Sequence, residues 1–313
     1  MAVPSNTYLT TAAVGIREDL HNLLYVISPS DTMFSSKIGK RGADNTKVEW
    51  LTDSLRASAQ NKRLRGDDRT PTAVTAATRL YNNCQVQSES FKVDDSLKAV
   101  KSAADVTSEE YLTAKFMKDL AGDVEWAFLR EARVDGTASV APAMRGALLW
   151  VTTNLNKASD ATLTASGAVT GGTSRAFTAA IATNTLQTMW AAGAKGKYTG
   201  YCGGFQKSQV SSWVDTGNYR IPVEGKKIND AIDVFFGDFG TVTFVPHRTM
   251  PTDVVFFCDH EYWKKATLRP TKKKKASPDS NLGDYTAVDI TVDHTLMALN
   301  EAANGRITNL TTS

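Results

Sequence analysis

The sequence has 313 residues, of which 42% are hydrophobic and 22% charged, and its formal net charge is +3. The composition lies near globular averages, which excludes a mainly disordered or collagen-like chain, and the length allows about two domains with a sizeable core. The net charge is too small to indicate nucleic-acid binding by itself. The N-terminus has no basic start followed by an apolar core, and no stretch approaches the roughly 18 apolar residues of a membrane span, so we predict neither a secretion signal nor membrane insertion.

The first predicted element is an amphipathic helix near the N-terminus. Its apolar residues recur at steps of four, three, one and three, which is the one-face pattern of a helix: Ile16, Leu20, Leu23, Leu24 and Ile27. Ser28 and Pro29 end it, because the residue before a proline is pushed out of the helical region. The chain then enters a long stretch with few core-forming side chains.

Residues 45–95 are predicted to form a long two-stranded hairpin with its tip near Gly66. Val48 and Trp50 alternate with polar neighbours, as in a strand with one covered face. Residues 52–78 contain no aromatic residue, and their large aliphatic residues are limited to Leu55, Leu64 and Val74. A segment this polar cannot bury enough surface to offset its ordering entropy. Two alternatives follow: the hairpin is a disordered flap, or it is ordered by lying on a surface outside its own domain.

A long helix is predicted over residues 107–134. Thr107 and Glu110 form a capping box, and Asp135 with Gly136 ends the run. Its apolar residues recur at steps of four and are Leu112, Phe116, Leu120, Val124 and Phe128. At 1.5 Å per residue the helix should be about 40 Å long, which suits a structural beam.

The second half of the chain is predicted to be a mixed α+β unit. Residues 151–174 are rich in Thr, Ser, Gly and Ala, which is typical of an exposed loop. A second helix follows, with the inward residues Phe177, Ile181, Leu186 and Trp190. Next come a short strand in YTGYCGG, a short helix in FQKSQVSSWVD, two β-rich runs around a Gly-Asp-Phe-Gly turn, an apolar strand in PTDVVFFCD, and two closing strands around residues 302–305.

Catalytic and metal-binding motifs are missing from the sequence. The histidines His21, His247, His260 and His294 include no His-Glu-x-x-His pair, and the adjacent residues 259–261 point in different directions, which disfavours a metal site. There is no phosphate-binding loop and no nucleophile elbow. The cysteines, Cys84, Cys202 and Cys258, are far apart and odd in number, so we interpret them as buried thiols in a reducing cytoplasm. We therefore predict no metal, no cofactor and no enzymatic activity.

The segment RPTKKKKASPDSNLGD is predicted to be a basic loop. Its lysines, Lys272, Lys273, Lys274 and Lys275, could contact phosphates, each neutralised phosphate adding salt-dependent affinity. The alternative is a solvated surface loop, which is the usual role of a lysine run without interleaved aromatics. Trp263 nearby is interpreted as a core anchor in preference to a base-stacking platform.

The order of these segments resembles the major capsid proteins of tailed bacteriophages with the Hong Kong 97-type fold. The resemblance covers most of the chain, and the stretches that carry it are IREDLHNLLYVISPSDTMFSSKIGK, VEWLTDSL, GDD at the hairpin tip, the long capped helix, TDVVFFCDHEYWKKATLRP and the closing GRITNLTTS. These stretches are structural in character, so the resemblance rests on their order and spacing together.

The resemblance implies five regions of the chain. They are an N-terminal arm and junction over residues 1–44, an extended hairpin called the E-loop over 45–93, a peripheral domain over 94–140 and 266–313, a spine helix within it at 107–134, and an axial domain over 141–265. The last strands would return to the peripheral sheet beneath the spine helix. Because family-like sequence begins by Thr10, we expect no fused scaffolding segment.

The resemblance also implies that a neighbouring subunit supplies the core that the E-loop lacks. Charged residues at the tip would then pair across that interface, namely Lys62, Arg63, Arg65, Asp67, Asp68 and Arg69. Some members of the fold join an E-loop lysine covalently to an asparagine of the next subunit. Lys62 lies in the corresponding region, although no partner asparagine can be identified in the sequence.

The implied function is that of a major capsid protein, located in the virion and assembled in the bacterial host cytoplasm. It would self-assemble into hexamers and pentamers that form an icosahedral head around double-stranded DNA. The implied partners are other copies of the chain, a portal protein at one vertex, a decoration or scaffolding protein, and packaged DNA held by non-specific contact. Two alternatives stay open: another phage assembly or tail structural protein, and an intracellular enzyme with an unrecognised site, which would need a deep pocket.

Overall fold

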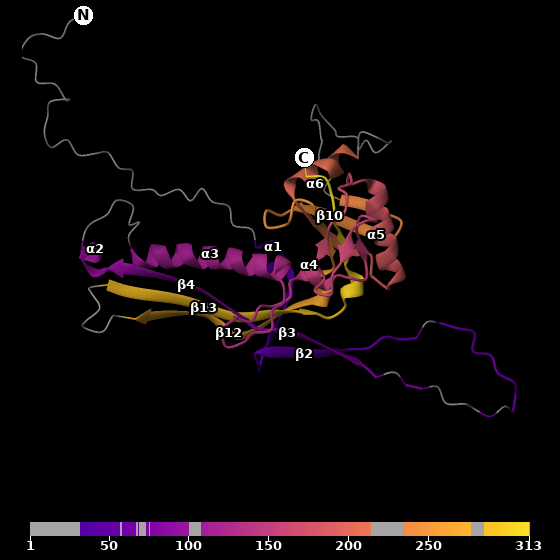
Figure 1. Cartoon of the computed structure of the whole chain (residues 1–313), viewed down its shortest axis with the longest axis horizontal. Helices are drawn as coiled ribbons and strands as arrows, with labels where there is room; N and C mark the ends of the chain where they lie inside the picture. Colours follow the sequence, from indigo (N-terminus) through magenta and orange to yellow (C-terminus); the bar gives the residue numbers. More distant parts are fainter. Residues whose placement is uncertain are drawn as a thin grey trace, which may run out of the picture.

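Two packed sheets and a long helix make up the body of the protein in a computed structural model of the chain (Figure 1). The structure describes residues 32–56, 58–66, 68, 73, 74, 76–99, 108–213, 234–276 and 285–312. The amphipathic helix predicted for residues 16–27 lies outside these ranges. No helix in the described ranges is long and apolar enough to cross a bilayer.

A four-stranded sheet packs against the long helix α3 (Glu109–Arg130). Its strands, in spatial order, are β1 (Gly39–Gly42), β12 (Trp263–Ala276), β13 (Tyr285–Ala298) and β4 (Gln85–Asp94). Val288, Ile290 and Val292 are buried while the two residues that alternate with them, Asp289 and Thr291, are partly exposed, which is the period-two pattern of a strand with one covered face. Phe91 of β4 stacks on Phe116 of α3, with ring centroids 4.9 Å apart. This sheet and helix form one continuous hydrophobic core.

The long helix is confirmed, but its ends differ from the prediction. Ser108 is the N-cap, because its side chain accepts a hydrogen bond from the Tyr111 backbone N–H at 3.2 Å, and the predicted cap residue Thr107 lies outside the described residues. The helix ends at Arg130, and Glu131 is extended. The chain around Gly146 crosses this end, where the Gly146 N–H donates to the Glu131 carbonyl oxygen at 2.8 Å. A tertiary contact therefore ends the helix before the Asp-Gly signal is reached.

A six-stranded mixed sheet forms the second body, with α5 (Ala179–Ala191) and α6 (Gly204–Ser212) packed on it. Its strands, in spatial order, are β5 (Leu155–Asn156), β14 (Gly305–Ile307), β11 (Val255–Cys258), β8 (Lys197–Cys202), β10 (Gly240–Pro246) and β9 (Val234–Gly237). All four residues of β11 are buried, which confirms the predicted apolar strand. β9 and β10 meet through the predicted glycine turn, with Gly237 opposite Gly240.

Two assignments in this region are wrong. We expected the last strands of residues 266–313 to return to the peripheral sheet beneath the spine helix. β13 lies in that sheet, but β14 pairs with β11, and Ile307 is fully buried in the six-stranded sheet. We expected Trp190 to face inward, but its side chain is 59% exposed, and Met189 is buried in its place. Met189 packs so closely on Gly305 that a Cβ there would lie 2.6 Å from its sulfur.

Short elements complete the fold. They are α1 (Met33–Lys37), α2 (Asp95–Ala99), α4 (Ala147–Trp150), the paired strands β2 (Lys47–Thr52) and β3 (Thr78–Asn83), and the paired strands β6 (Thr162–Leu163) and β7 (Val169–Thr170). Residues 151–174, predicted to be an exposed loop, contain β5, β6 and β7 and bury Ala158 and Ala161. The three cysteines are buried and unpaired.

Candidate functional site: the extended hairpin and the helix junction

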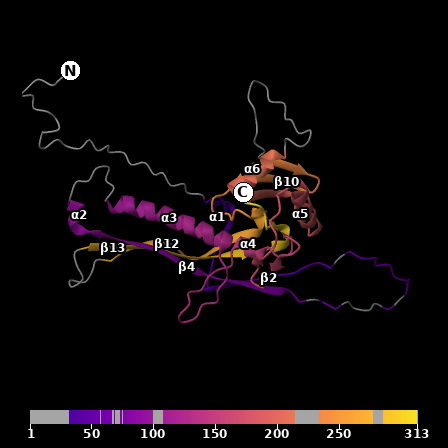
Figure 2. The same cartoon turned by 45° about the horizontal axis from the view of Figure 1, so that its top comes forward.

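The hairpin formed by β2 and β3 is anchored only at its base. Its six-pair ladder runs from Lys47 opposite Asn83 to Thr52 opposite Thr78. The Trp50 indole donates to the Ala298 carbonyl oxygen at 2.9 Å and fixes the base on β13. The predicted hairpin of residues 45–95 is therefore shorter than expected, because β4 belongs to the four-stranded sheet. Figures 1 and 2 both show the described residues beyond this ladder, between Thr52 and Thr78, extending far from the body.

The apolar residues of this extension are not buried by their own chain. Leu55 is 99% exposed, Leu64 84% and Val74 95%. Gly66 has φ +85, the left-handed conformation that a tight turn at the tip requires. Of the predicted tip residues, Lys62, Arg63, Arg65 and Asp68 are exposed, while Asp67 and Arg69 lie outside the described residues. The extension therefore has the exposed aliphatics and charges of a surface that lacks its partner.

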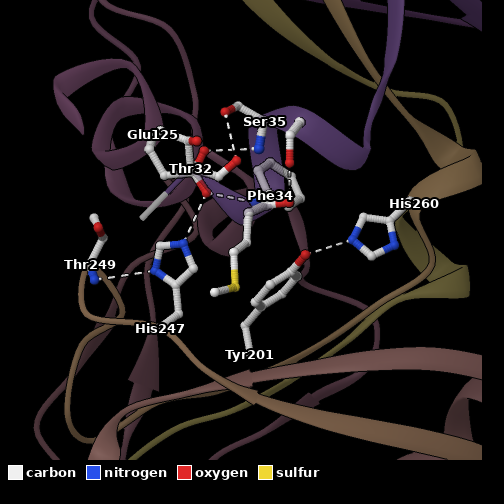
Figure 3. Close-up of polar contacts among 10 residues, drawn as sticks. Thr32, Phe34, Ser35, Glu125, Tyr201, His247, Thr249 and His260 are labelled. Carbon is white, nitrogen blue, oxygen red and sulfur yellow. Dashed lines mark hydrogen bonds and ion pairs between the residues drawn. The ribbon is translucent and has the colours of Figure 1, made fainter. Parts of the chain in front are cut away.

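A buried carboxylate holds α1 to the long helix (Figure 3). Glu125 is 0% exposed, and its two oxygens accept hydrogen bonds from the backbone N–H groups of Phe34 at 2.6 Å and Ser35 at 2.8 Å. These are the N–H groups that the first turn of a helix leaves unsatisfied, and the N-cap residue Thr32 makes no side-chain hydrogen bond to them. Glu125 thus caps α1 from 90 residues away.

His247 completes the junction from the loop after β10. Its Nδ1 accepts a hydrogen bond from the Thr249 backbone N–H at 3.2 Å, so the ring proton lies on Nε2 and is donated to Glu125 at 2.9 Å. Burial acts to raise the pKa of Glu125 and is the largest single influence, but the hydrogen bonds from His247, Ser35 and Phe34 together outweigh it and hold that pKa below its usual value. The carboxylate therefore ties α1, α3 and the six-stranded sheet together.

The other buried titratable groups are placed for packing. The Tyr201 hydroxyl and His260 Nε2 lie 2.7 Å apart, and burial with the nearby Lys37 lowers the pKa of His260 to about 4. Burial, with a smaller effect from Lys265, lowers the pKa of His294 to about 3. Burial raises the pKa of Cys84 to about 11, so its thiol is inert at neutral pH. Within the described ranges, no three His, Cys, Asp or Glu residues are arranged to hold a metal ion.

The lysine run is not a loop where the structure describes it. Lys272 to Lys275 belong to β12, in register with residues 288–291 of β13. Their side chains therefore alternate between the two faces of the sheet. Lys273 and Lys275 both reach Glu109 at the start of α3, with Nζ to Oε1 distances of 2.7 and 2.6 Å. The hydrogen bond from Lys273, followed by that from Lys275, lowers the pKa of Glu109. Lys272 and Lys274 lie on the opposite face and are exposed.

Sequence reasoning missed the Glu125 junction and correctly assigned Trp263. Trp263 is fully buried, and its indole donates to Asn304 Oδ1 at 2.9 Å. Glu125 lies between Val124 and Phe128, inside the apolar stripe of α3, and a carboxylate at such a position signals a buried polar contact. Nothing in the sequence pattern identifies its partners, which are distant in the chain.

A family model and several solved structures match nearly the whole length of the chain. A family model described as SU10 major capsid protein matches residues 3–311. No curated protein matches the sequence. Similar solved structures include the Cyanophage A-1(L) capsid (TM-score 0.69, 12% identity, covering 96% of this chain and 98% of that one) and the capsid of the native GTA particle (TM-score 0.65, 13% identity, 96% and 98%). The Cyanophage P-SCSP1u capsid also matches (TM-score 0.63, 12% identity, 100% and 99%). At these identities the structural likeness shows a shared fold.

Proposed function

This chain belongs to the SU10 major capsid protein family and is a bacteriophage capsid protein of the Hong Kong 97-type fold, and from this premise we propose that its extended hairpin joins neighbouring subunits. Copies exchange hairpins within hexamers and pentamers, and these capsomers close an icosahedral head around double-stranded DNA. The protein acts as a structural component and not as an enzyme. A portal protein at one vertex and a separate decoration or scaffolding protein are the other proposed partners.

One observation supports the hairpin assignment above the others. Leu55, Leu64 and Val74 are each more than four-fifths exposed on an extension that is anchored only through its base. Aliphatic burial contributes about 25 cal/mol per Å², while ordering the backbone costs roughly 1 to 2 kcal/mol per residue, so the extension cannot be ordered by its own contacts. A second copy of the chain supplies the missing surface, and the tip charges set the register of that contact.

The purified protein is expected to assemble, because its hairpin aliphatics stay exposed in an isolated chain. Light scattering should show species far larger than the 33.9 kDa monomer, and negative-stain images should show closed rings or shells. A stable monomer under every condition tested, including high protein concentration and the addition of crowding agents, would contradict the proposal.

We also propose that the lysine face of β12 contacts packaged DNA, and the structure divides the lysines into two pairs that can be compared. Changing Lys272 and Lys274 to glutamine should lower DNA retention, because these two are exposed on the face opposite α3. Changing Lys273 and Lys275 to glutamine is the matched control, since these two pair with Glu109. Each lost phosphate contact should reduce the slope of log affinity against log salt by about one.

DNA retention is measured as the absorbance ratio of purified particles across a salt series. Equal DNA content in both double variants and in the wild type would contradict the proposed DNA contact and would show that the lysine run is a solvated surface. Loss of DNA from the Lys273 and Lys275 variant alone would contradict the assignment of faces. Neither variant should prevent formation of empty shells, because no buried contact of the core is removed.

A further inference from the structure

α1 lies between the two bodies of the protein and touches both. By its chain it belongs to the first body, the four-stranded sheet with α3, because β1 follows it directly and pairs with β12. Its side chain Phe34 is fully buried and reaches the second body, the six-stranded sheet with α5 and α6. Figure 3 shows Phe34 between Glu125 and the pair formed by Tyr201 and His260. A five-residue helix therefore spans the boundary between the bodies.

Phe34 fills an aromatic pocket on one face of the six-stranded sheet. Its ring centroid lies 6.1 Å from that of Tyr201 in β8 and 6.2 Å from that of Phe256 in β11. On the first body, the ring centroid of Trp263 at the start of β12 lies 6.1 Å away. Phe257 alternates with Phe256 and belongs to the core on the other face of the sheet, which α5 and α6 cover. α1 is thus part of the cover of the face that points toward the first body.

α1 is too short to be a stable helix by itself. It has five residues, well below the roughly 12 to 15 that an isolated helix needs in water. Its N-cap residue Thr32 makes no side-chain hydrogen bond, and Glu125 of α3 caps its first turn. The order of α1 therefore depends on two contacts, the Phe34 ring in the pocket and the Glu125 cap. Loss of one weakens the other, because both hold the same short segment.

The polar groups around α1 keep partners when α1 leaves. Glu125 also accepts a hydrogen bond from His247 at 2.9 Å, and the Tyr201 hydroxyl and His260 Nε2 lie 2.7 Å apart. Neither of these contacts involves α1. A buried carboxylate that lost every donor would make undocking very costly, whereas this one keeps its histidine. The junction therefore lets α1 undock without leaving the carboxylate unpaired.

The chain crosses between the two bodies at three places, two of which meet at one residue. The crossings are residues 131–146, 259–262 and 299–304. Asn304 Oδ1 accepts hydrogen bonds from the Asp259 backbone N–H at 2.8 Å and from the Trp263 indole at 2.9 Å, so it ties the second crossing to the third. Trp263 also contacts Phe34. α1 therefore lies against the point about which the bodies could turn.

We propose that α1 is a detachable wedge that locks the angle between the two bodies. When α1 is docked, Phe34 and the Glu125 cap hold the six-stranded sheet against α3. When α1 is undocked, the bodies turn about the crossings that Asn304 ties together. The inference concerns a single subunit and holds whether or not hairpins join neighbouring copies, so it goes beyond the proposed function.

The angle is measured as the distance between two spin labels in unassembled subunits, by pulsed electron paramagnetic resonance. The labels are attached at Ser90→Cys in β4 and Gln187→Cys in α5, which are exposed positions on the two bodies. The native cysteines are buried, so the label reacts with the introduced thiols. The chain with its natural α1 should give one narrow distance. Phe34→Ala should add a second, broad distance, with at least a tenfold rise in the undocked population, because alanine loses the aromatic contacts.

Met33→Ala is the matched control for this variant. It shortens the neighbouring side chain of the same helix, which is 36% exposed, and it should keep the single narrow distance. A single narrow distance in Phe34→Ala, accompanied only by a lower unfolding temperature, would overturn the proposal and make Phe34 an ordinary core residue. Equal broadening in both variants would also overturn it, because the pocket contact would then have no special role.

A second variant tests the wedge without creating a cavity. Ser35→Pro removes the N–H that donates to Glu125 and pushes Phe34 out of the helical conformation, while every core side chain is kept. It should broaden the distance as Phe34→Ala does, and circular dichroism should show that both bodies stay folded. If Phe34→Ala fails to fold, this variant decides the question. A single narrow distance in Ser35→Pro would contradict the wedge.

A peptide added in trans tests whether the pocket recognises Phe34. A synthetic peptide with the sequence of residues 30–40 should restore the narrow distance in Phe34→Ala, because it refills the pocket. The same peptide carrying the Phe34→Ala substitution is the control and should leave the broad distance unchanged. Equal effects of the two peptides would show that the pocket does not select the phenylalanine ring and would overturn the proposal.

Discussion

Removing the hairpin tip, by joining Ala57 to Ala73 through a tight turn, is expected to abolish closed shells while both sheets stay folded. The deletion leaves the β2 and β3 ladder intact, since that ladder ends at Thr52 and Thr78. It also leaves the hydrophobic core intact, because none of the buried core residues lies between residues 51 and 83. Under the proposed role of the hairpin, the lost contacts are those between chains, and a closed assembly requires every copy to make them.

Circular dichroism, thermal unfolding and electron microscopy together check this result. The unfolding temperature of unassembled subunits should match the wild type within a few degrees. A second variant replaces residues 58–72 by a Gly and Ser sequence of equal length, which keeps the reach of the hairpin and removes its side chains. Shells from that variant would show that reach is sufficient and side-chain contacts are not needed. Normal shells from the deletion variant would refute the role of the hairpin. Global unfolding of that variant would show that the hairpin tip belongs to the hydrophobic core of its own subunit.

Glu125→Gln is expected to release α1 from the long helix. The carboxylate accepts hydrogen bonds from two backbone N–H groups and from His247, whereas an amide would turn its NH2 group toward at least one of these donors. Leaving one of these buried donors unsatisfied costs about 1 to 3 kcal/mol. Because a free-energy change of about 1.4 kcal/mol corresponds to a tenfold change in an equilibrium constant, the local-opening equilibrium of α1 should increase roughly tenfold to a hundredfold.

Limited proteolysis after Lys37 measures this opening, and thermal unfolding of unassembled subunits measures the stability change. Glu110→Gln is the matched control, because it makes the same substitution at an exposed position of the same helix. Cleavage after Lys37 at the wild-type rate in Glu125→Gln would show that the junction does not hold α1. Equal effects from both variants would point to a loss of helix stability instead.

The effect of Glu125→Gln should also depend on pH. The pKa of Glu125 is lowered in the folded protein, so its carboxylate contributes stability that is fully present above the unfolded pKa of about 4.3 and is lost as the pH falls through the folded pKa. The difference between wild type and variant should therefore be largest at neutral pH and shrink in strong acid. His294, whose pKa is lowered to about 3, is present in both proteins and cancels in the comparison.

Elements whose evidence is local can be predicted from the amino-acid sequence alone. The four-residue spacing of Leu120, Val124 and Phe128 identified the buried face of α3, because a helix repeats every 3.6 residues. The continuous apolar run identified β11 as a buried strand, and the lack of core residues between 52 and 78 identified an extension that its own chain cannot bury. The resemblance, carried by the order of these segments, indicated the family.

Features that depend on contacts between distant residues become visible only in the folded chain. β14 belongs to the six-stranded sheet, and α3 ends where the chain near Gly146 crosses it. The lysines predicted to lie in a loop belong to strand β12, where they alternate between the two faces of the sheet. The folded chain also pairs Glu125 with Phe34 and His247, which are 91 and 122 residues away. A periodic pattern reports which face of an element is apolar, but the partner that covers it is chosen by packing among all the elements, and no local pattern encodes that choice.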